Sequence, residues 1–275
     1  MRRELMAESG SNARVGPGIA ARVAAFVARR SRLARFACVA VLLFAQPQAA
    51  LALAFQPTEA EWYHWPDYCQ ARYTVSGAGT DSQFANRVDP ATVKNWESRL
   101  GPEVWYALHH YCAGMIFAQR AKLEPDKKER NALYNRAIEE DQFTLQRMPV
   151  SHPMRAEIAA RMGLIFGELG QQDAAVQHFD LAIEGCPSCG VGYEAKSMFL
   201  KSQGQLAAAR DVLEAGDKAV DGSSAQIHYF LGLVLLDLKD FDAASAQARR
   251  AYALGYPLPG LRDLLAKAGH PLTTP

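Results

Sequence analysis

Small and apolar residues recur in the second half of the chain with a period of about 34 residues. The same order of small and apolar positions, separated by 3, 4, 5, 4, 3 and 5 residues, occurs three times. The three copies are Gly163, Phe166, Gly170, Ala175, Phe179, Ala182 and Pro187; Ser197, Leu200, Gly204, Ala209, Leu213, Gly216 and Asp221; and Gly232, Leu235, Lys239, Ala244, Ala248, Ala251 and Tyr256. A period of this length predicts a stack of helix-turn-helix units.

The residue types at these positions agree with that interpretation. In the first copy, Gly163 and Ala175 fall where two antiparallel helices of one unit touch, and small side chains let the backbones approach closely. Phe179 fills the space beside them, and Gly170 supplies the tight turn between the helices. Pro187 ends the second helix because it lacks the backbone donor that the next turn needs.

At these positions the chain resembles the tetratricopeptide repeat (TPR) family. The resemblance implies an all-α fold, a right-handed superhelical solenoid of TPR helix-turn-helix repeats. The three expected repeats are residues 156–189, 190–223 and 225–258. In this family the array is a binding surface, so the resemblance specifies an architecture without specifying a chemistry.

The flanking segments predict further helices. Residues 104–149 resemble a degenerate, stretched repeat with about four residues inserted around Leu123–Lys128. Residues 55–101 are expected to form a helical N-terminal cap, with a capping box at Thr58 and Glu61 and a helix stop at Gly101-Pro102. Residues 259–275 are expected to form a C-terminal capping helix that covers the last repeat with Leu261, Leu264 and Leu265.

The first 54 residues have the pattern of a secretory signal peptide. A basic stretch precedes the apolar run Phe36–Ala45, and an Ala-x-Ala sequence predicts cleavage after Ala54. The alternative is an uncleaved membrane anchor, which is disfavoured because Gln46-Pro47-Gln48 interrupts the apolar run well short of the roughly 20 residues of a spanning helix. We therefore expect a periplasmic or secreted protein without a membrane span after cleavage.

Charge argues against one class of ligand. Residues 1–54 contain eight Arg and two Glu, which gives +6, whereas the whole chain carries +1. The remaining chain therefore carries about −5 and has no Lys/Arg-rich run. A mildly acidic surface of this kind disfavours nucleic acid as a partner.

Four cysteines follow the predicted signal peptide, namely Cys69, Cys112, Cys186 and Cys189. An even number in an oxidising compartment predicts disulfides, for which three pairings exist. We favour Cys69–Cys112 together with a local Cys186–Cys189 loop. The local pair would then be a structural staple between repeats. It could instead be redox-active, bind zinc or remain as free thiols. Covalent haem attachment is disfavoured because Gly190 stands where a His is required.

His109 and Cys112 share one helix face and form the densest set of candidate ligands. Further ligands from His64 or Cys69 would be needed for a zinc or haem site. The chain has no phosphate-binding glycine loop, no HExxH and no serine elbow. We therefore expect no enzyme, no cofactor and no metal. A thiol-redox or metal-binding module that uses Cys186/Cys189 or His109/Cys112 is the alternative.

The resemblance also implies where a partner would bind. In TPR proteins the first helix of each repeat lines a concave groove at about its second, fifth, ninth, twelfth and thirteenth positions. The groove residues expected here are Tyr111, Met115, Leu164, Glu168, Met198, Lys201, Tyr229 and Leu233, with Glu157, Glu194, Gln226 and Asp237 as further polar members. The Lys and Asn clamp by which some members bind a C-terminal carboxylate is absent. The alternative is that these side chains only pack between repeats.

These observations predict a non-catalytic scaffold in the envelope of a Gram-negative bacterium. The expected partner is a protein or peptide with an amphipathic or extended segment, in an assembly, secretion or polymer-export system. Self-association into a homo-oligomer, through the groove or the aromatic cap, is a further hypothesis.

Overall fold

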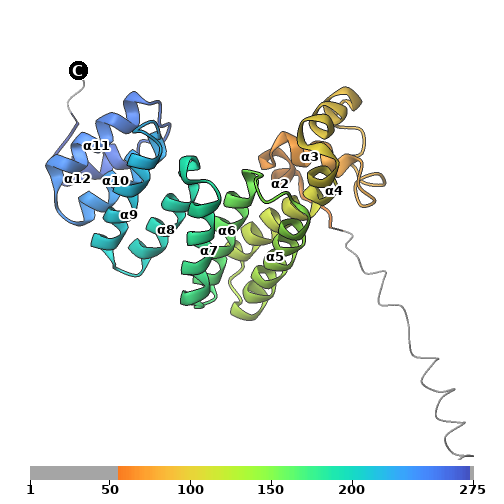
Figure 1. Ribbon diagram of the computed structural model, residues 1–275, viewed down its shortest axis with the longest axis horizontal. Helices are drawn as coiled ribbons and strands as arrows, with labels where there is room; N and C mark the ends of the chain where they lie inside the picture. Colours follow the sequence, from red (N-terminus) through yellow and green to blue (C-terminus); the bar gives the residue numbers. More distant parts are fainter. Residues whose placement is uncertain (1–54, 273–275) are drawn as a thin grey trace, which may run out of the picture. The chain divides into compact units, whose positions relative to one another are not determined.

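The computed structural model describes residues 55–272, and their regular structure is entirely helical (Figure 1). The predicted signal peptide, residues 1–54, lies outside the described residues. The main helices form four pairs, which are α4 (Pro90–Leu123) with α5 (Lys127–Arg147), α6 (Met154–Glu168) with α7 (Gln172–Gly185), α8 (Val191–Ser202) with α9 (Leu206–Ala219), and α10 (Ala225–Asp237) with α11 (Phe241–Ala253). Successive pairs pack against one another, so the predicted all-α helical solenoid is confirmed.

Shorter helices flank these pairs. Helices α2 (Glu59–His64) and α3 (Asp67–Thr74) precede α4, and α12 (Gly260–Lys267) packs on α10 and α11. A single 3-10 turn, η1 (Pro187–Cys189), connects α7 to α8. Within the described residues, no helix is both long and apolar enough to cross a membrane.

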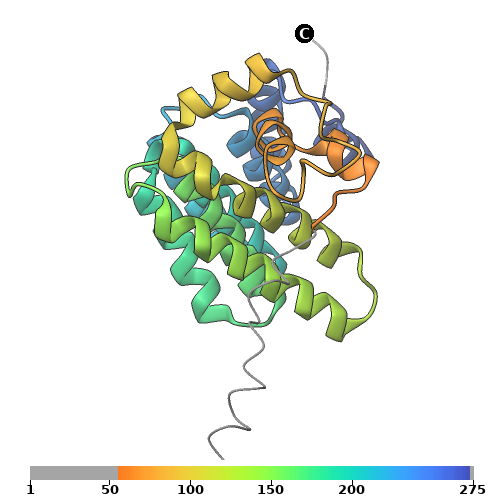
Figure 2. The same ribbon diagram turned by 90° about the vertical axis from the view of Figure 1, so that its right-hand side faces the viewer.

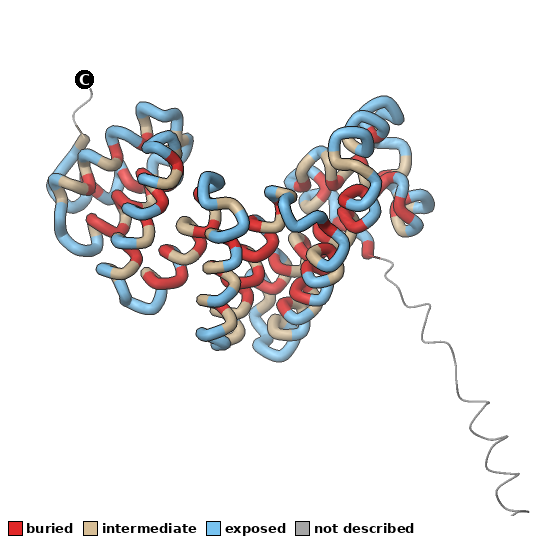
Figure 3. Tube along the Cα trace, viewed as in Figure 1, coloured by how far each residue is buried: buried red, intermediate tan, exposed pale blue. Residues whose placement is uncertain are grey.

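Small residues lie at the close contacts within each pair. A Cβ atom on Gly163 would stand 2.5 Å from the ring of Phe179, so the α6–α7 contact has no room for a larger side chain. Ala175, Ala209 and Ala244, at equivalent places in the three repeats, are fully buried. One continuous apolar cluster runs from α6 to α12, and Figure 3 shows the buried residues on the helix sides that face each other.

The turn between the two helices of each repeat requires a left-handed residue. Gly170 and Gly204 occupy this place with φ of 76° and 73°. In the third repeat Lys239 takes the same conformation, with φ of 66°. A lysine there carries a steric cost that glycine avoids.

The first pair is longer than the others. Helix α5 has 21 residues and its counterpart α7 has 14. Helix α4 bends sharply at Gly101, whose φ of 77° and ψ of 162° are not helical. The break falls where Gly101-Pro102 was expected to stop a helix, so α4 consists of two helices joined across a kink at Gly101.

Helix α3 packs against α4 at the N-terminal end of the described residues (Figure 2). Aromatic side chains and a disulfide hold these helices together. The rings of Trp62 and Phe84 stack with centroids 4.5 Å apart. Cys69 of α3 is bonded to Cys112 of α4, and the Trp65 side chain donates a hydrogen bond to the Cys112 carbonyl over 3.1 Å. The N-terminal helices are therefore attached to α4 both by apolar packing and by a covalent bond.

The C-terminal helix α12 closes the other end of the array. Leu261 and Leu265 are fully buried against the last repeat. Leu264, which was also expected to cover that repeat, is 42% exposed. The expectation for Leu264 is wrong because a helix of two turns presents only one side to the repeat.

Candidate functional site

The first helices of the three repeats, α6, α8 and α10, lie side by side. Helix α8 contacts both α6 and α10, so equivalent positions of the three helices are neighbours. The residues expected to line the groove belong to these helices and to α4.

A cavity of about 540 Å³ lies where α6, α8 and α10 begin. Each of the three helix starts contributes to its wall. The lining residues are Pro153, Glu157, Cys189, Val191, Glu194, Ser224 and Gln226. Four of them, Glu157, Val191, Glu194 and Gln226, stand at second or fifth positions of their repeats, which are the positions expected to face the groove.

The cavity is acidic, because its lining contains two carboxyl groups and no basic side chain among the described residues. Burial raises the pKa of the Glu194 carboxyl to about 7, and a weak contact from the Ser224 hydroxyl, at 3.4 Å, opposes this only partly. The Tyr111 hydroxyl donates a hydrogen bond to Glu157 over 3.0 Å. Glu194 can therefore exchange a proton near neutral pH.

Farther along the helices the predicted apolar positions are open to different degrees. Met198 is 44% exposed, whereas Leu164 and Leu233 are half-buried against the apolar core. An ion pair of 2.7 Å between Lys201 of α8 and Asp237 of α10 spans two neighbouring repeats. Glu168 is exposed and Met115 is half-buried.

Two of the expected groove residues are covered by neighbouring side chains. Tyr111 is buried, with the Arg161 guanidinium 4.5 Å from its ring centroid. Tyr229 is also buried, and its ring stacks on Tyr256 at 4.0 Å. Both rings therefore support the neighbouring helices, and neither offers an open apolar face.

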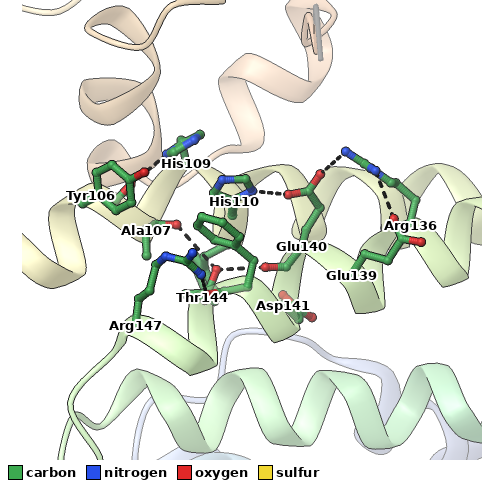
Figure 4. Close-up of polar contacts among 12 residues, drawn as sticks. Tyr106, Ala107, His109, His110, Arg136, Glu139, Glu140, Asp141, Thr144 and Arg147 are labelled. Carbon is green, nitrogen blue, oxygen red and sulfur yellow. Dashed lines mark hydrogen bonds and ion pairs between the residues drawn. The ribbon is translucent and has the colours of Figure 1, made fainter. Parts of the chain in front are cut away.

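A separate polar cluster joins α4 to α5 (Figure 4). His110 contacts the buried Glu140 carboxylate, which also receives Arg136 at 2.8 Å. Burial lowers the pKa of His109 to about 4, with further contributions from His110 and Arg72. The His110–Glu140 contact is a polar link between two helices, and the Arg136–Glu140 ion pair lies within α5.

The same region bears on the alternative metal site at His109 and Cys112. The Cys112 sulfur is bonded to Cys69, so it offers no thiolate. The residues from 55 to 272 contain no group of three or more His, Cys, Asp or Glu side chains placed to hold a metal ion.

The structure also pairs Cys186 with Cys189, and Cys189 lines the cavity. Sequence reasoning treated this pair as a staple between repeats and did not connect it with Glu194. The sequence could have indicated this connection, because Cys189 directly precedes α8. The second and fifth positions of the repeat that begins with α8 were expected to face the groove.

Comparison with solved structures finds matches at low sequence identity. A MamA fragment, residues 41 to the end, from Desulfovibrio magneticus RS-1 is 20% identical over 57% of this chain and 87% of its own, with a TM-score of 0.38. A MamA RS-1 double mutant is 19% identical over 56% and 82%, with a TM-score of 0.39. TTC0263, a thermophilic TPR protein of Thermus thermophilus, is 18% identical over 62% and 95%, with a TM-score of 0.42.

Comparison of the sequence itself gives a more local result. Among curated proteins, none matches the chain. The family model described as tetratricopeptide repeat matches residues 225–254, which comprise α10 and α11. This match falls on the third of the repeats recognised from their spacing. The chain therefore contains a tetratricopeptide repeat at residues 225–254, formed by α10 and α11.

Proposed function

We propose that this protein is an interaction scaffold that binds an extended or amphipathic segment of a partner protein across α6, α8 and α10. Tetratricopeptide repeats typically form protein-binding scaffolds. The binding surface proposed here, called the groove below, consists of Leu164, Met198, Leu233 and the Lys201–Asp237 pair, with the acidic cavity at one edge. It requires no loop to become ordered, so little conformational entropy is lost on binding.

The observation that carries this proposal is the alignment of three apolar residues on adjacent helices. Leu164, Met198 and Leu233 occupy the same place in three successive repeats. Met198 is the most exposed of them, and its unbranched side chain adapts to irregular apolar partners. The Lys201–Asp237 ion pair and the carboxyl groups of the acidic cavity favour a partner segment with polar, partly basic flanks.

We further propose that the protein works in the envelope of a Gram-negative bacterium, after cleavage behind Ala54. The signal-like pattern of residues 1–54 supports this location. Two disulfides within the described residues also support it, because such bonds persist mainly outside the cytoplasm. An assembly, secretion or polymer-export system is the expected setting.

The test is site-specific photo-crosslinking in intact envelopes. A crosslinking residue replaces Met198 in the groove, or Leu181 on α7 as a control of similar exposure, 49%. We expect partner adducts from position 198 and few from position 181. The adducts at 198 should decrease at least tenfold when Leu233 is changed to Glu.

Affinity capture with Met198→Glu plus Leu233→Glu completes the test. Leu181→Glu plus Leu254→Glu is the matched control, since Leu254 is 47% exposed. Capture of the same partners by the groove variant and the wild type would contradict the proposal. If the crosslinks at position 198 join two copies of this chain, with a doubled mass by light scattering, the groove serves self-association instead.

A further inference from the structure

The Cys186–Cys189 disulfide differs from Cys69–Cys112 in its access to solvent. Cys69 and Cys112 are 0% and 1% exposed. Cys186 is half-buried at the end of α7, and Cys189 is exposed at the end of η1 and lines the acidic cavity. A thiol that enters the cavity can therefore reach Cys189, whereas the other disulfide is closed to it.

Cys189 stands directly before the N-terminus of α8. The N-cap residue of this helix is Gly190, and no side chain caps its free backbone donors. The unsatisfied N–H groups give that helix end a partial positive charge. The helix N-terminus favours a thiolate at Cys189, which is one of the known ways to make a cysteine reactive, and ionised carboxyl groups in the cavity oppose it.

Glu194 lies beside this cysteine in the same cavity. Its Oε1 atom is 3.2 Å from the position that a Cβ atom on Gly190 would occupy, so the carboxyl group lies against the residue that follows Cys189. Glu157 from α6 and the Ser224 hydroxyl from α10 share the cavity with it. Tyr256, beyond α11, is also in electrostatic reach of Glu194.

Opening this disulfide leaves the repeat core untouched. The bond closes a loop between residues only 3 apart in sequence. The contact between α7 and α8 depends on buried side chains such as Phe179, Ala182 and Phe199, none of which belongs to the loop. The pair can therefore be reduced and reoxidised while the protein remains folded.

We propose that Cys186–Cys189 is a redox-active disulfide that oxidises a dithiol of a partner protein in the acidic cavity, with Cys189 as the attacked sulfur and Glu194 as the proton acceptor. This inference does not depend on the groove, because it needs only the cavity at the helix starts.

The reaction proceeds in two exchanges. Glu194 takes the proton of the incoming thiol, the resulting thiolate attacks the Cys189 sulfur, and the Cys186–Cys189 bond breaks as Cys186 leaves and takes a proton from solvent. The second partner thiol loses its proton to solvent and attacks the partner sulfur of the mixed disulfide, which releases Cys189 as a thiolate. Cys189 then takes the proton that Glu194 holds. The partner loses two electrons and becomes a disulfide, and this protein gains them as a dithiol.

The test measures how fast reduced dithiothreitol, as the dithiol probe, opens the disulfide in the whole folded protein at pH 7. Thiol labelling and mass spectrometry separate the two disulfides. The reference is a disulfide-closed Cys-Pro-Ser-Cys-Gly peptide, which has the loop without the cavity. We expect the protein loop to react at least about tenfold faster than the peptide, and Glu194→Gln to remove most of that advantage.

Glu184→Gln is the matched control, because Glu184 is exposed on α7 and lies outside the cavity. Its rate should equal that of the wild type. The rate in the wild type should also show an inflection near pH 7 that Glu194→Gln lacks. Equal rates for protein and peptide, or equal rates and pH profiles for wild type and Glu194→Gln, would overturn the proposal. Circular dichroism of each variant establishes that it is folded.

Discussion

The α4–α5 pair and the three later pairs bring two helices together around a small residue, but they place different side chains against it. In α6–α7, Gly163 makes room for the ring of Phe179. In α4–α5, Gly114 at the equivalent place makes room for Asp141, since a Cβ on Gly114 would stand 2.7 Å from the Asp141 carboxylate. One spacing pattern therefore supports both an apolar and a charged interface.

The charged interface extends to the next pair. Asp141 is fully buried, and Arg161 of α6 donates two hydrogen bonds to it, one of them over 2.9 Å from Nε. Although burial opposes the charge on Arg161, Asp141 raises the pKa of its guanidinium. The contact between α5 and α6 thus includes a buried ion pair, beside hydrogen bonds from Arg155 to the carbonyls of Leu145 and Met148. The contacts from α6 to α12 are mainly apolar.

Removing half of that ion pair should have the largest effect. Asp141→Ala leaves Arg161 buried without its partner, which should cost about 3 to 5 kcal/mol of unfolding free energy. Urea denaturation followed by circular dichroism measures this. The double variant Asp141→Leu plus Arg161→Met should recover most of the loss, because it removes both charges. If Asp141→Ala is as stable as the wild type, the Asp141–Arg161 ion pair does not stabilise the contact between α5 and α6.

The next largest effect on stability is expected from removing one of the two disulfides. Cys69–Cys112 closes a loop of 43 residues, so its replacement by two serines should cost about 3 to 4 kcal/mol. Replacement of Cys186 and Cys189, only 3 residues apart, should cost clearly less, because the loop that they close is short. Guanidinium titrations of the two double variants compare them, and equal losses would contradict the comparison.

The two regions should also respond oppositely to pH. Glu194 has a pKa of about 7 when folded and about 4.5 when unfolded, so the folded state holds the proton more tightly and stability falls as pH rises through that window. His109 has a pKa of about 4 when folded and about 6.5 when unfolded, so stability rises with pH from 4 to 6.5. Each contribution amounts to at most about 3 kcal/mol.

Unfolding free energies measured from pH 4.5 to 7 test this prediction. The wild type should vary little, because the two contributions have opposite signs. Glu194→Gln should become more stable with rising pH, and His109→Gln less stable. Parallel pH profiles for both variants would contradict the assignment.

The smallest expected effect concerns the turn of the third repeat. Lys239→Gly should stabilise the protein by about 1 kcal/mol, because glycine adopts the positive φ of this place without strain. Gly204→Lys, the reciprocal change in the second repeat, should destabilise by a similar amount. Thermal unfolding of the two variants should show shifts of opposite sign.

The regular part of the fold could be predicted because it depends on local spacing. The intervals from Gly163 to Pro187 reflect helix geometry within one unit, and the alignment of Lys239 with Gly170 and Gly204 already indicated its strained turn. The break at Gly101-Pro102 was visible for the same reason, since both residues act on their own backbone.

The charged contacts could not be predicted in this way. Asp141 and Arg161 lie in different helices, and no period connects them. The cavity likewise arises from three helix starts in three repeats, so Cys189 and Glu194 become neighbours of Ser224 only after the repeats stack. The exposure of Met198 and the burial of Tyr111 and Tyr229 depend on the same stacking, although all three occupy groove positions in the repeat pattern.

The burial of Cys69–Cys112 has a consequence for the order of events in maturation. An oxidant cannot reach these sulfur atoms once α3 has docked on α4, so the bond must form while the cap is still assembling. Chains that reach an oxidising compartment already folded would keep these thiols reduced. Cys189 is exposed and can be oxidised at any later time. The state of Cys69–Cys112 therefore depends on the conditions during folding, whereas the state of Cys186–Cys189 depends on the redox conditions around the folded protein.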